Sequence, residues 1–245
     1  MIKLEDVKVF NIEGAITGMR FPMQSWEKSD SKHEFFGYLQ QNGQLYSSEE
    51  TKFIVGPNDL ALAQKLIASG ADSHSKFLRQ IFVSMNITAP LYWWKEMDTY
   101  KVGTTSNSES TMHRLAKTPI TKECFSLDSN LTDLPVMQSV SWEFPQIQPL
   151  DNFIYDCIFV CENLRQKYVE TGDKHYWRAL IQLLPSSWNQ MRHWTANFQV
   201  LRKIYIDRRF HKLQEWRDFC AEIKKLPYGK ELITFGVNKN DTTTS

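Results

Sequence analysis

Residues 81–100 read IFVSMNITAPLYWWKEMDTY, and two kinds of local pattern meet in them at one proline. The β-branched and apolar residues of 81–87 favour a strand. Ala89-Pro90 ends this strand, because proline lacks the N–H group that a central strand donates. The same proline is compatible with the start of a helix, and we predict a helix over 91–100. A strand that leads directly into a helix predicts a domain built from both.

The chain before this stretch mixes strands and helices as well. We predict strands over 8–12 (KVFNI) and 51–55 (TKFIV), a loop over 24–32 and a helix over 60–69. Gly56-Pro57-Asn58 indicates a turn, and either Asn58 or Asp59 is expected to cap the helix that follows. Gly70 is expected to end that helix.

After residue 100 the chain has a polar stretch and an irregular stretch, and from residue 152 onward it is expected to be mainly helical. Residues 99–115 are rich in Ser and Thr, and they form either a surface loop or a segment that binds something polar. Residues 126–149 carry three prolines and are expected to be irregular. Helices are predicted over 152–170, 174–184, 188–205 and 211–225.

No repeat and no linker divides the sequence. We therefore predict an α+β fold: a single domain over 1–237 with a mixed β-sheet, surrounding helices and a helical C-terminal half. The polar residues 238–245 are expected to form a frayed tail.

Composition excludes several classes of protein. The 29 Lys and Arg residues nearly balance the 28 Asp and Glu residues, which argues against a nucleic-acid partner. No apolar run approaches the roughly 20 residues that a membrane span needs, and MIKLEDVKVF is unlike a secretory signal. Four cysteines do not make a disulfide framework in a chain of this length. We therefore expect a cytoplasmic protein with no membrane partner.

The usual catalytic signatures are absent from the sequence. It contains no Gly-rich phosphate loop, no Cys-x-x-Cys, no His-Glu-x-x-His and no Gly-x-Ser-x-Gly. The six histidines do not cluster with carboxylates at ligand spacing, so we expect no metal. Cys157 and Cys161 lie one helical turn apart and are expected to be small buried hydrophobic residues.

Three polar islands remain, at 73–76, 101–114 and 197–215. In the last of them Arg208 and Arg209 precede His211. Guanidinium groups form bidentate, charge-assisted hydrogen bonds, so this group could hold a phosphate or polarise a carbonyl. The alternative is a solvated basic helix end that pairs with acidic neighbours such as Asp207 and Glu215.

The middle island resembles a motif of the flavin-dependent thymidylate synthases. That family shows a His ahead of a strand ending in Ala-Pro, and here His74 precedes Ala89-Pro90 at the family's spacing. The family then shows Arg-His-Arg-x-x-Ser-x-Asn-Glu-x-Ser-x-Arg-Tyr. The equivalent run over 100–113 is YKVGTTSNSESTMH, in which Asn107 and Ser110 match in place.

The last island resembles the same family. Its Leu-Pro, Trp-Thr-x-Asn and following Arg correspond to Leu184-Pro185, Trp194 to Asn197, and Arg208 at matching spacings, with His211 and Glu215 one residue early. The Arg-His-Arg triplet, which in the family serves flavin and nucleotide binding, is replaced by Tyr100-Lys101-Val102. Two further family arginines are also absent, and Arg114 and Arg178 lie close to their places.

The resemblance implies an enzyme that converts dUMP to dTMP by reductive methylation. Methylenetetrahydrofolate would supply the carbon, NADPH would reduce FAD, and the family's homotetramer would build each site from several subunits. No enzyme nucleophile is needed in that scheme, since the cofactor carries the chemistry. The residues assigned by the resemblance are Arg208 with Arg209 in reserve for catalysis, Ser110, Arg114, Arg178 and Arg208 for the substrate, and His74, Lys101, Asn107, Asn197 and His211 for the flavin or folate.

Two other classes of function stay open. A non-catalytic nucleotide-binding or interaction protein could retain this fold, and loss of the Arg triplet favours it. Retention of Asn107, Ser110, Asn197 and Arg208 at the family's spacing disfavours it. A purely structural α+β protein is the third class, and it predicts no stabilisation by any ligand.

Overall fold

The computed structural model describes residues 2–35, 38–41, 44–47, 51–131, 133–139 and 145–237. The predicted tail over 238–245 lies outside these residues. The chain divides into two compact units. Unit 1 comprises Met1–Glu5, Asn86–Thr99 and Ser106–His193, and unit 2 comprises Asp6–Met85, Tyr100–Thr105 and Trp194–Ser245. Each unit is described by itself.

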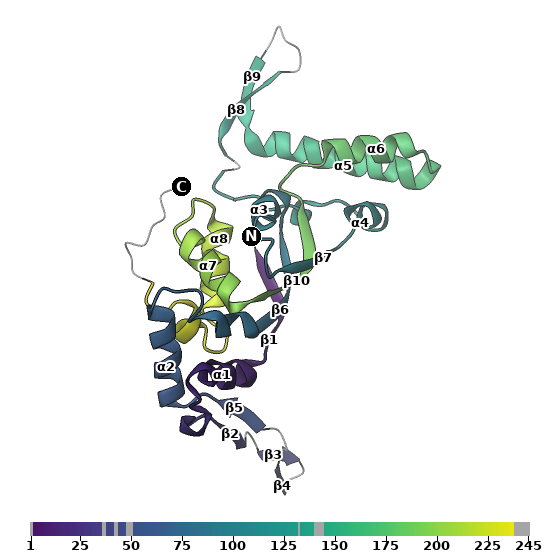
Figure 1. The fold of residues 1–245 in the computed structure, drawn as a ribbon. Coiled ribbons are helices and arrows are strands. Elements are labelled where there is room, and N and C mark those ends of the chain that lie inside the picture. Colours follow the sequence, from purple (N-terminus) through teal and green to yellow (C-terminus); the bar gives the residue numbers. More distant parts are fainter. Residues whose placement is uncertain are drawn as a thin grey trace. The chain divides into compact units, whose positions relative to one another are not determined.

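The described chain contains both strands and helices, as in an α+β fold (Figure 1). The strands are β1 (Lys3–Phe10), β2 (Lys32–Phe35), β3 (Tyr38–Gln41), β4 (Gln44–Ser47), β5 (Thr51–Ile54), β6 (Phe82–Pro90), β7 (Thr105–Ser108), β8 (Pro135–Ser139), β9 (Pro145–Pro149) and β10 (Asn189–Asn197). The helices are α1 (Ile12–Arg20), α2 (Pro57–Ala68), α3 (Leu91–Met97), α4 (Thr111–Lys117), α5 (Leu150–Thr171), α6 (Lys174–Leu183), α7 (Phe198–Arg208) and α8 (Gln214–Ile223).

The largest sheet has the strand order β1-β6-β10-β7. In β6 every second side chain is fully buried, namely Val83, Met85, Ile87 and Ala89. This alternation is what a strand with one covered face requires. Three antiparallel pairs accompany the sheet: β2 with β5, β3 with β4, and β8 with β9.

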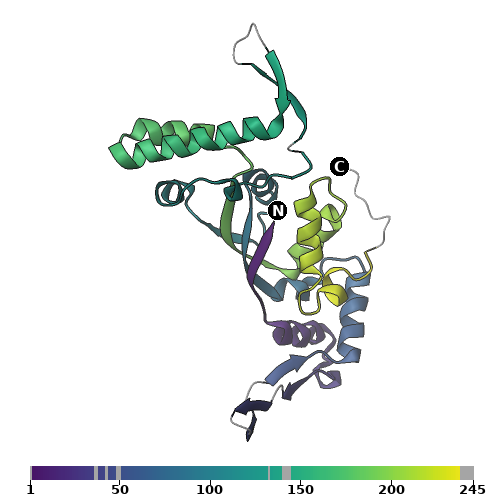
Figure 2. The same ribbon diagram turned by 180° about the vertical axis from the view of Figure 1, so that it is seen from behind.

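In unit 1, helices α5 and α6 lie side by side (Figures 1 and 2). Gly172 joins them with a φ of 69°, a left-handed conformation that glycine adopts without cost. The core of this unit is an apolar cluster of Leu115, Ile120, Cys124, Phe125, Cys161, Leu180 and Trp188. Cys157 and Cys161 were predicted to be buried. This prediction is confirmed for Cys161, which is fully buried, while Cys157 is half-buried.

In unit 2, helix α7 packs against α8, against the short turn Lys76–Gln80 and against Gly229–Ile233. The buried faces of α7 and α8 include Leu201, Ile204, Trp216 and Phe219. Asp59 is also buried, and it forms an ion pair with Arg20 of α1. Burial alone raises the pKa of Asp59, but hydrogen bonds from Ser29, Ser31 and Arg20 outweigh it and lower that pKa below its ordinary value.

Several predicted elements are confirmed. The strand over 51–55 is β5, the strand within 81–90 is β6, and the helices over 91–100, 152–170, 174–184 and 211–225 are α3, α5, α6 and α8, with shifted ends. The helix over 60–69 begins earlier, at Pro57. Its N-cap is Gly56 rather than Asn58 or Asp59, and the Asp59 side chain instead accepts a hydrogen bond from Arg20. The strand predicted over 8–12 corresponds to the end of β1, which stops at Phe10. Asn11, with a φ of 63°, is the N-cap of α1, and this helix was not predicted from the sequence.

Two predictions were wrong. The helix over 188–205 is strand β10 followed by α7, since Asn189–Asn197 pairs within the sheet. The irregular stretch 126–149 contains the hairpin of β8 and β9, whose prolines lie at strand ends, where no central donor is lost. Of the two alternatives left open for the polar stretch 99–115, the surface loop is not what the structure shows, because the stretch holds β7 and α4. The predicted loop over 24–32 includes one short helical turn, Trp26–Lys28.

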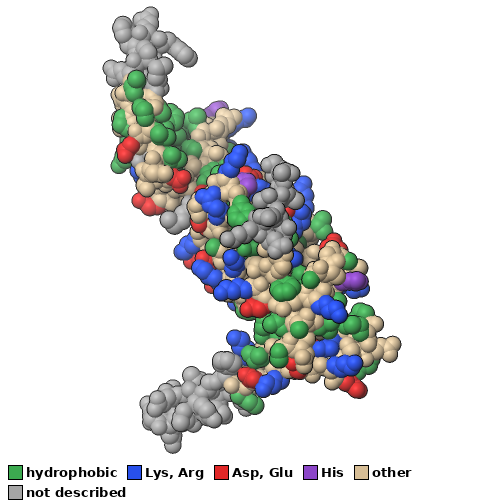
Figure 3. Space-filling model, turned by 90° about the vertical axis from the view of Figure 1, so that its left-hand side faces the viewer, with side chains coloured by type: hydrophobic (Ala, Val, Ile, Leu, Met, Phe, Trp, Pro, Cys, Tyr) green, Lys and Arg blue, Asp and Glu red, His purple; other side chains and the backbone are tan. Residues whose placement is uncertain are grey.

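On the face drawn in Figure 3, basic, acidic and hydrophobic side chains lie interspersed. Within the residues described, no helix combines the length and the apolar character that crossing a membrane demands.

Candidate functional site

Arg208 lies at the end of α7 in an aromatic setting. Its Nε donates a hydrogen bond to the hydroxyl of Tyr100 over 3.0 Å. Its guanidinium carbon lies 4.8 Å from the centre of the Trp216 ring and 5.7 Å from that of Tyr100. The two rings meet edge to face at 6.1 Å. Arg208 is half-buried, so a cation held against these rings contributes more than an exposed one would.

Tyr100 is in turn linked to Asp207. The tyrosine hydroxyl donates a hydrogen bond to Oδ2 of Asp207 over 3.4 Å. The same oxygen accepts a hydrogen bond from Nζ of Lys203 over 3.0 Å. Burial raises the pKa of Tyr100 above 10; Arg208 partly offsets this effect and Asp207 adds to it. The phenol therefore stays protonated at neutral pH, able to donate to Asp207 and accept from Arg208.

His211 follows directly after this helix. Its backbone N–H donates to the carbonyl of Arg208 over 3.0 Å, and its ring lies 6.3 Å from that of Trp216. Its Nδ1 accepts a hydrogen bond from the N–H of Leu213 over 3.2 Å. Arg209 points elsewhere: it stacks on Phe210 at 4.9 Å and lines a separate hollow of about 340 Å³. The structure thus groups Arg208 with His211 and leaves Arg209 on another surface.

Asn197 is the N-cap of α7, and its side chain also lies against the turn that contains Gly103. Its Oδ1 accepts the N–H of Val200 over 3.0 Å, which caps the helix. A Cβ built at Gly103 would lie 2.9 Å from Nδ2 of Asn197, and Gly103 has a φ of 77°. The turn that carries Lys101 therefore lies against the start of α7, while Lys101 itself is exposed.

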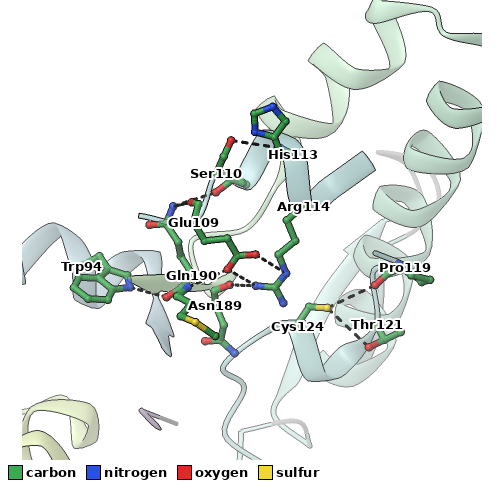
Figure 4. Close-up of polar contacts among 12 residues, drawn as sticks. Trp94, Glu109, Ser110, His113, Arg114, Pro119, Thr121, Cys124, Asn189 and Gln190 are labelled. Atoms are coloured by element: carbon green, nitrogen blue, oxygen red, sulfur yellow. Dashed lines mark hydrogen bonds and ion pairs between the residues drawn. The ribbon is translucent and has the colours of Figure 1, made fainter. Parts of the chain in front are cut away.

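In unit 1 the second group of predicted residues surrounds α4 (Figure 4). Ser110 is exposed and caps this helix, accepting the N–H of His113 over 3.4 Å. Arg114 lies on the same helix, and its Nη1 donates to the carbonyl of Asn189 over 2.9 Å. It also pairs with Glu109 at 3.3 Å and covers the Trp188 ring at 4.8 Å.

The remaining predicted residues are more isolated. His74 is exposed in unit 2, with its Nδ1 3.0 Å from the hydroxyl of Ser69. Asn107 is exposed on β7, and Arg178 is exposed on α6, both in unit 1. Within single units, then, the structure groups Arg208 with His211, Asn197 with the turn of Lys101, and Ser110 with Arg114.

Sequence reasoning missed the partners that hold these arginines. Tyr100 and Trp216 frame Arg208, and Trp188 supports Arg114. The signal available was the tyrosine that replaces the first family arginine at residue 100. The tryptophans gave no signal, because a buried Trp is more often part of the core.

The predicted flavin residues have the chemistry that FAD requires. His74, Lys101 and Asn107 are exposed, so their polar groups can reach a ligand, and such donors suit its phosphate and hydroxyl oxygens. The hollows described within the units measure about 810, 340 and 110 Å³, and none of the three is lined by these residues. Each of these side chains, taken within its own unit, thus offers polar groups that suit the phosphate and hydroxyl oxygens of FAD.

No protein-family profile and no curated protein sequence matches the chain. Solved structures do match it. The chain has the α+β fold of the flavin-dependent thymidylate synthases and of a related nucleotide methylase.

Two of the matching structures span nearly the whole chain. The flavin-dependent thymidylate synthase ThyX from Helicobacter pylori, complexed with FAD and dUMP, has a TM-score of 0.63 at 17% identity, over 96% of this chain and 98% of its own. The UMP/dUMP methylase PolB from Streptomyces cacaoi, bound with 5-Br dUMP, has a TM-score of 0.60 at 13% identity, over 100% and 98%. At these identities the likeness establishes the fold.

Proposed function

We propose that the protein is a flavin-dependent enzyme that methylates a uracil nucleotide, converting dUMP to dTMP with methylenetetrahydrofolate as the carbon donor. The observation that carries the proposal is Arg208, at the family's spacing and held between Tyr100 and Trp216. The shared fold supports it, since both structures cited above bind a uracil nucleotide.

Arg208 would contact the pyrimidine and stabilise the negative charge that develops on it, which a fixed cation does without reorganising. Arg209 would act in its place only if its side chain turned away from Phe210. Ser110, Arg114 and Arg178 would bind the nucleotide, with Ser110 near its phosphate. Arg114 already faces the carboxylate of Glu109, so a phosphate would have to replace that carboxylate.

His74, Lys101, Asn107, Asn197 and His211 would hold FAD, with His211 near the flavin or the folate. FAD, when bound, supplies the reducing electrons, and NADPH would replenish them. We further propose a cytoplasmic homotetramer in which each site draws on more than one copy. The exposed apolar side chains Phe153, Tyr155 and Phe159 of α5 support self-association, since such surfaces are usually covered.

Purified protein tests the proposal directly. It should show a flavin absorption band at about 450 nm, and FAD and dUMP should each raise the melting temperature. UMP, measured in parallel, shows whether the sugar 2′-hydroxyl is tolerated. Colourless protein that neither ligand stabilises would refute a flavoenzyme.

Arg208→Ala should abolish dTMP formation and leave the circular dichroism spectrum unchanged. Arg79→Ala is the matched control, because Arg79 is exposed and pairs only loosely with Asp72 at 3.6 Å. Turnover by Arg208→Ala at the wild-type rate would remove this residue from the reaction.

A non-catalytic nucleotide-binding or interaction protein is the second candidate. It is favoured by Tyr100-Lys101-Val102 in place of the Arg triplet and by the pairing of Arg114 with Glu109. Complementation of a thymidine-requiring bacterial strain separates the two candidates. Growth without thymidine supports the enzyme, and failure despite soluble, dUMP-binding protein supports the second candidate.

A further inference from the structure

We infer that Tyr100 is a positioning residue for Arg208: its hydroxyl fixes the Nε edge of the guanidinium and thereby sets the orientation in which the cation meets a pyrimidine. The inference rests on the proposed function and assigns a role to the residue that stands where the family motif has its first arginine.

The contact is directional. Nε of Arg208 donates to the phenol oxygen over 3.0 Å, while the phenol proton is directed to Oδ2 of Asp207 at 3.4 Å. With its proton committed to Asp207, the hydroxyl presents a lone pair to Arg208. Lys203, one helical turn before Asp207, holds that carboxylate at 3.0 Å. The acceptor that Arg208 meets is thus itself held in place.

The rings add a second restraint. Trp216 is fully buried and lies 4.8 Å below the guanidinium carbon, so it fixes the plane of the group. A plane fixed by Trp216 and an edge fixed by Tyr100 leave the side chain little rotational freedom. An arginine ordered before binding loses less entropy when a ligand arrives.

The residue type at position 100 matters for this role. The family resemblance places an arginine there, and a second guanidinium would repel Arg208 and offer it no acceptor. Tyrosine offers an acceptor and an aromatic face. The replacement at this position therefore exchanges a cation for a group that orients the neighbouring cation.

Tyr100→Phe tests the inference, because it keeps the ring and removes only the hydroxyl. The control is Tyr168→Phe, whose phenol is on α5 and half-buried like that of Tyr100. Tyr100→Phe should weaken dUMP binding about tenfold in calorimetric titration, the loss expected for a hydrogen bond to a charged group. Tyr168→Phe should bind like the wild type. If the wild type binds dUMP and Tyr100→Phe binds it equally well, the inference alone is overturned; if the wild type does not bind it, the proposed function falls as well.

A second measurement needs no ligand. In the ¹⁵N spectrum of the wild type, the Nε–H of Arg208, assigned by its loss in Arg208→Lys, should exchange with water at least about tenfold more slowly than that of Arg79, whose side chain is 54% exposed. Slow exchange that is lost in Tyr100→Phe supports the inference. Exchange as fast as that of Arg79 overturns it.

Discussion

Asp59→Asn removes the charge from one of the most enclosed ion pairs of unit 2. Asp59 is fully buried and Arg20 is 5% exposed, so the variant leaves the guanidinium without its counter-charge. The carboxylate also accepts the hydroxyls of Ser29, over 2.6 Å, and of Ser31, and the N–H of Ser31 over 3.2 Å. An amide can accept through only one of its two terminal atoms, so part of this network loses its acceptor as well.

Breaking a buried pair from one side costs about 3–5 kcal/mol in the free energy of unfolding. In a chain of this size each kcal/mol lowers the melting temperature by roughly 2–4 °C, so we expect a fall of about 6–20 °C. Urea titration followed by circular dichroism measures the free energy, and calorimetry measures the temperature. The control Asp72→Asn removes a carboxylate that is 76% exposed and should cost less than about 1 kcal/mol.

The same variant predicts a change in pH dependence. The pKa of Asp59 is lowered in the fold, so its contribution is present above the unfolded-state value of 3.8 and is lost as the pH falls below it. Wild-type stability should therefore fall more steeply than that of Asp59→Asn below about pH 4. A cost for Asp59→Asn no larger than that for Asp72→Asn would show that the pair is not enclosed as the structure has it.

Three further outcomes are expected. Burial raises the pKa values of Cys161 and Cys220 to about 12, so iodoacetamide at pH 8 should modify both only after unfolding, as mapped by mass spectrometry; labelling of the folded protein would contradict this. Arg114→Lys should cost about 1 kcal/mol in the free energy of unfolding, because lysine cannot reproduce both the stacking on Trp188 and the contacts to Glu109; an unchanged urea midpoint would contradict it. If 1–237 is a single cooperative domain, as we propose, calorimetric and van't Hoff enthalpies should agree, and two separate transitions would contradict it.

The local elements were largely predictable from sequence, because strand and helix periods differ. β6 alternates buried and partly exposed residues, and α5 and α6 end at glycine and before proline as their sequences indicate. The prediction of a helix over 188–205 failed for a physical reason. The first half of this stretch pairs with strands that are remote in sequence, and this pairing outweighs the local preference for a helix. The prolines of β8 and β9 led to the wrong prediction of an irregular stretch. Only the register of the hairpin shows that these prolines lie at the ends of the two strands.

The candidate site was predictable only in part. The family resemblance suggested Arg208, Asn197 and Ser110 as candidates, but it did not suggest the partners that hold Arg208. Tyr100 lies 108 residues away, and Trp216 belongs to the next helix. Such neighbours become visible only when the chain is folded, because hydrogen bonds and ring contacts depend on geometry that no local pattern encodes.

Gly103 sets a limit for anyone who wishes to redesign this protein. Its left-handed backbone strains any other residue at that position, and a side chain there would crowd the amide of Asn197. A mutational library aimed at new specificity can vary its exposed neighbour Val102, whereas each variant at residue 103 would strain the turn that lies against the helix.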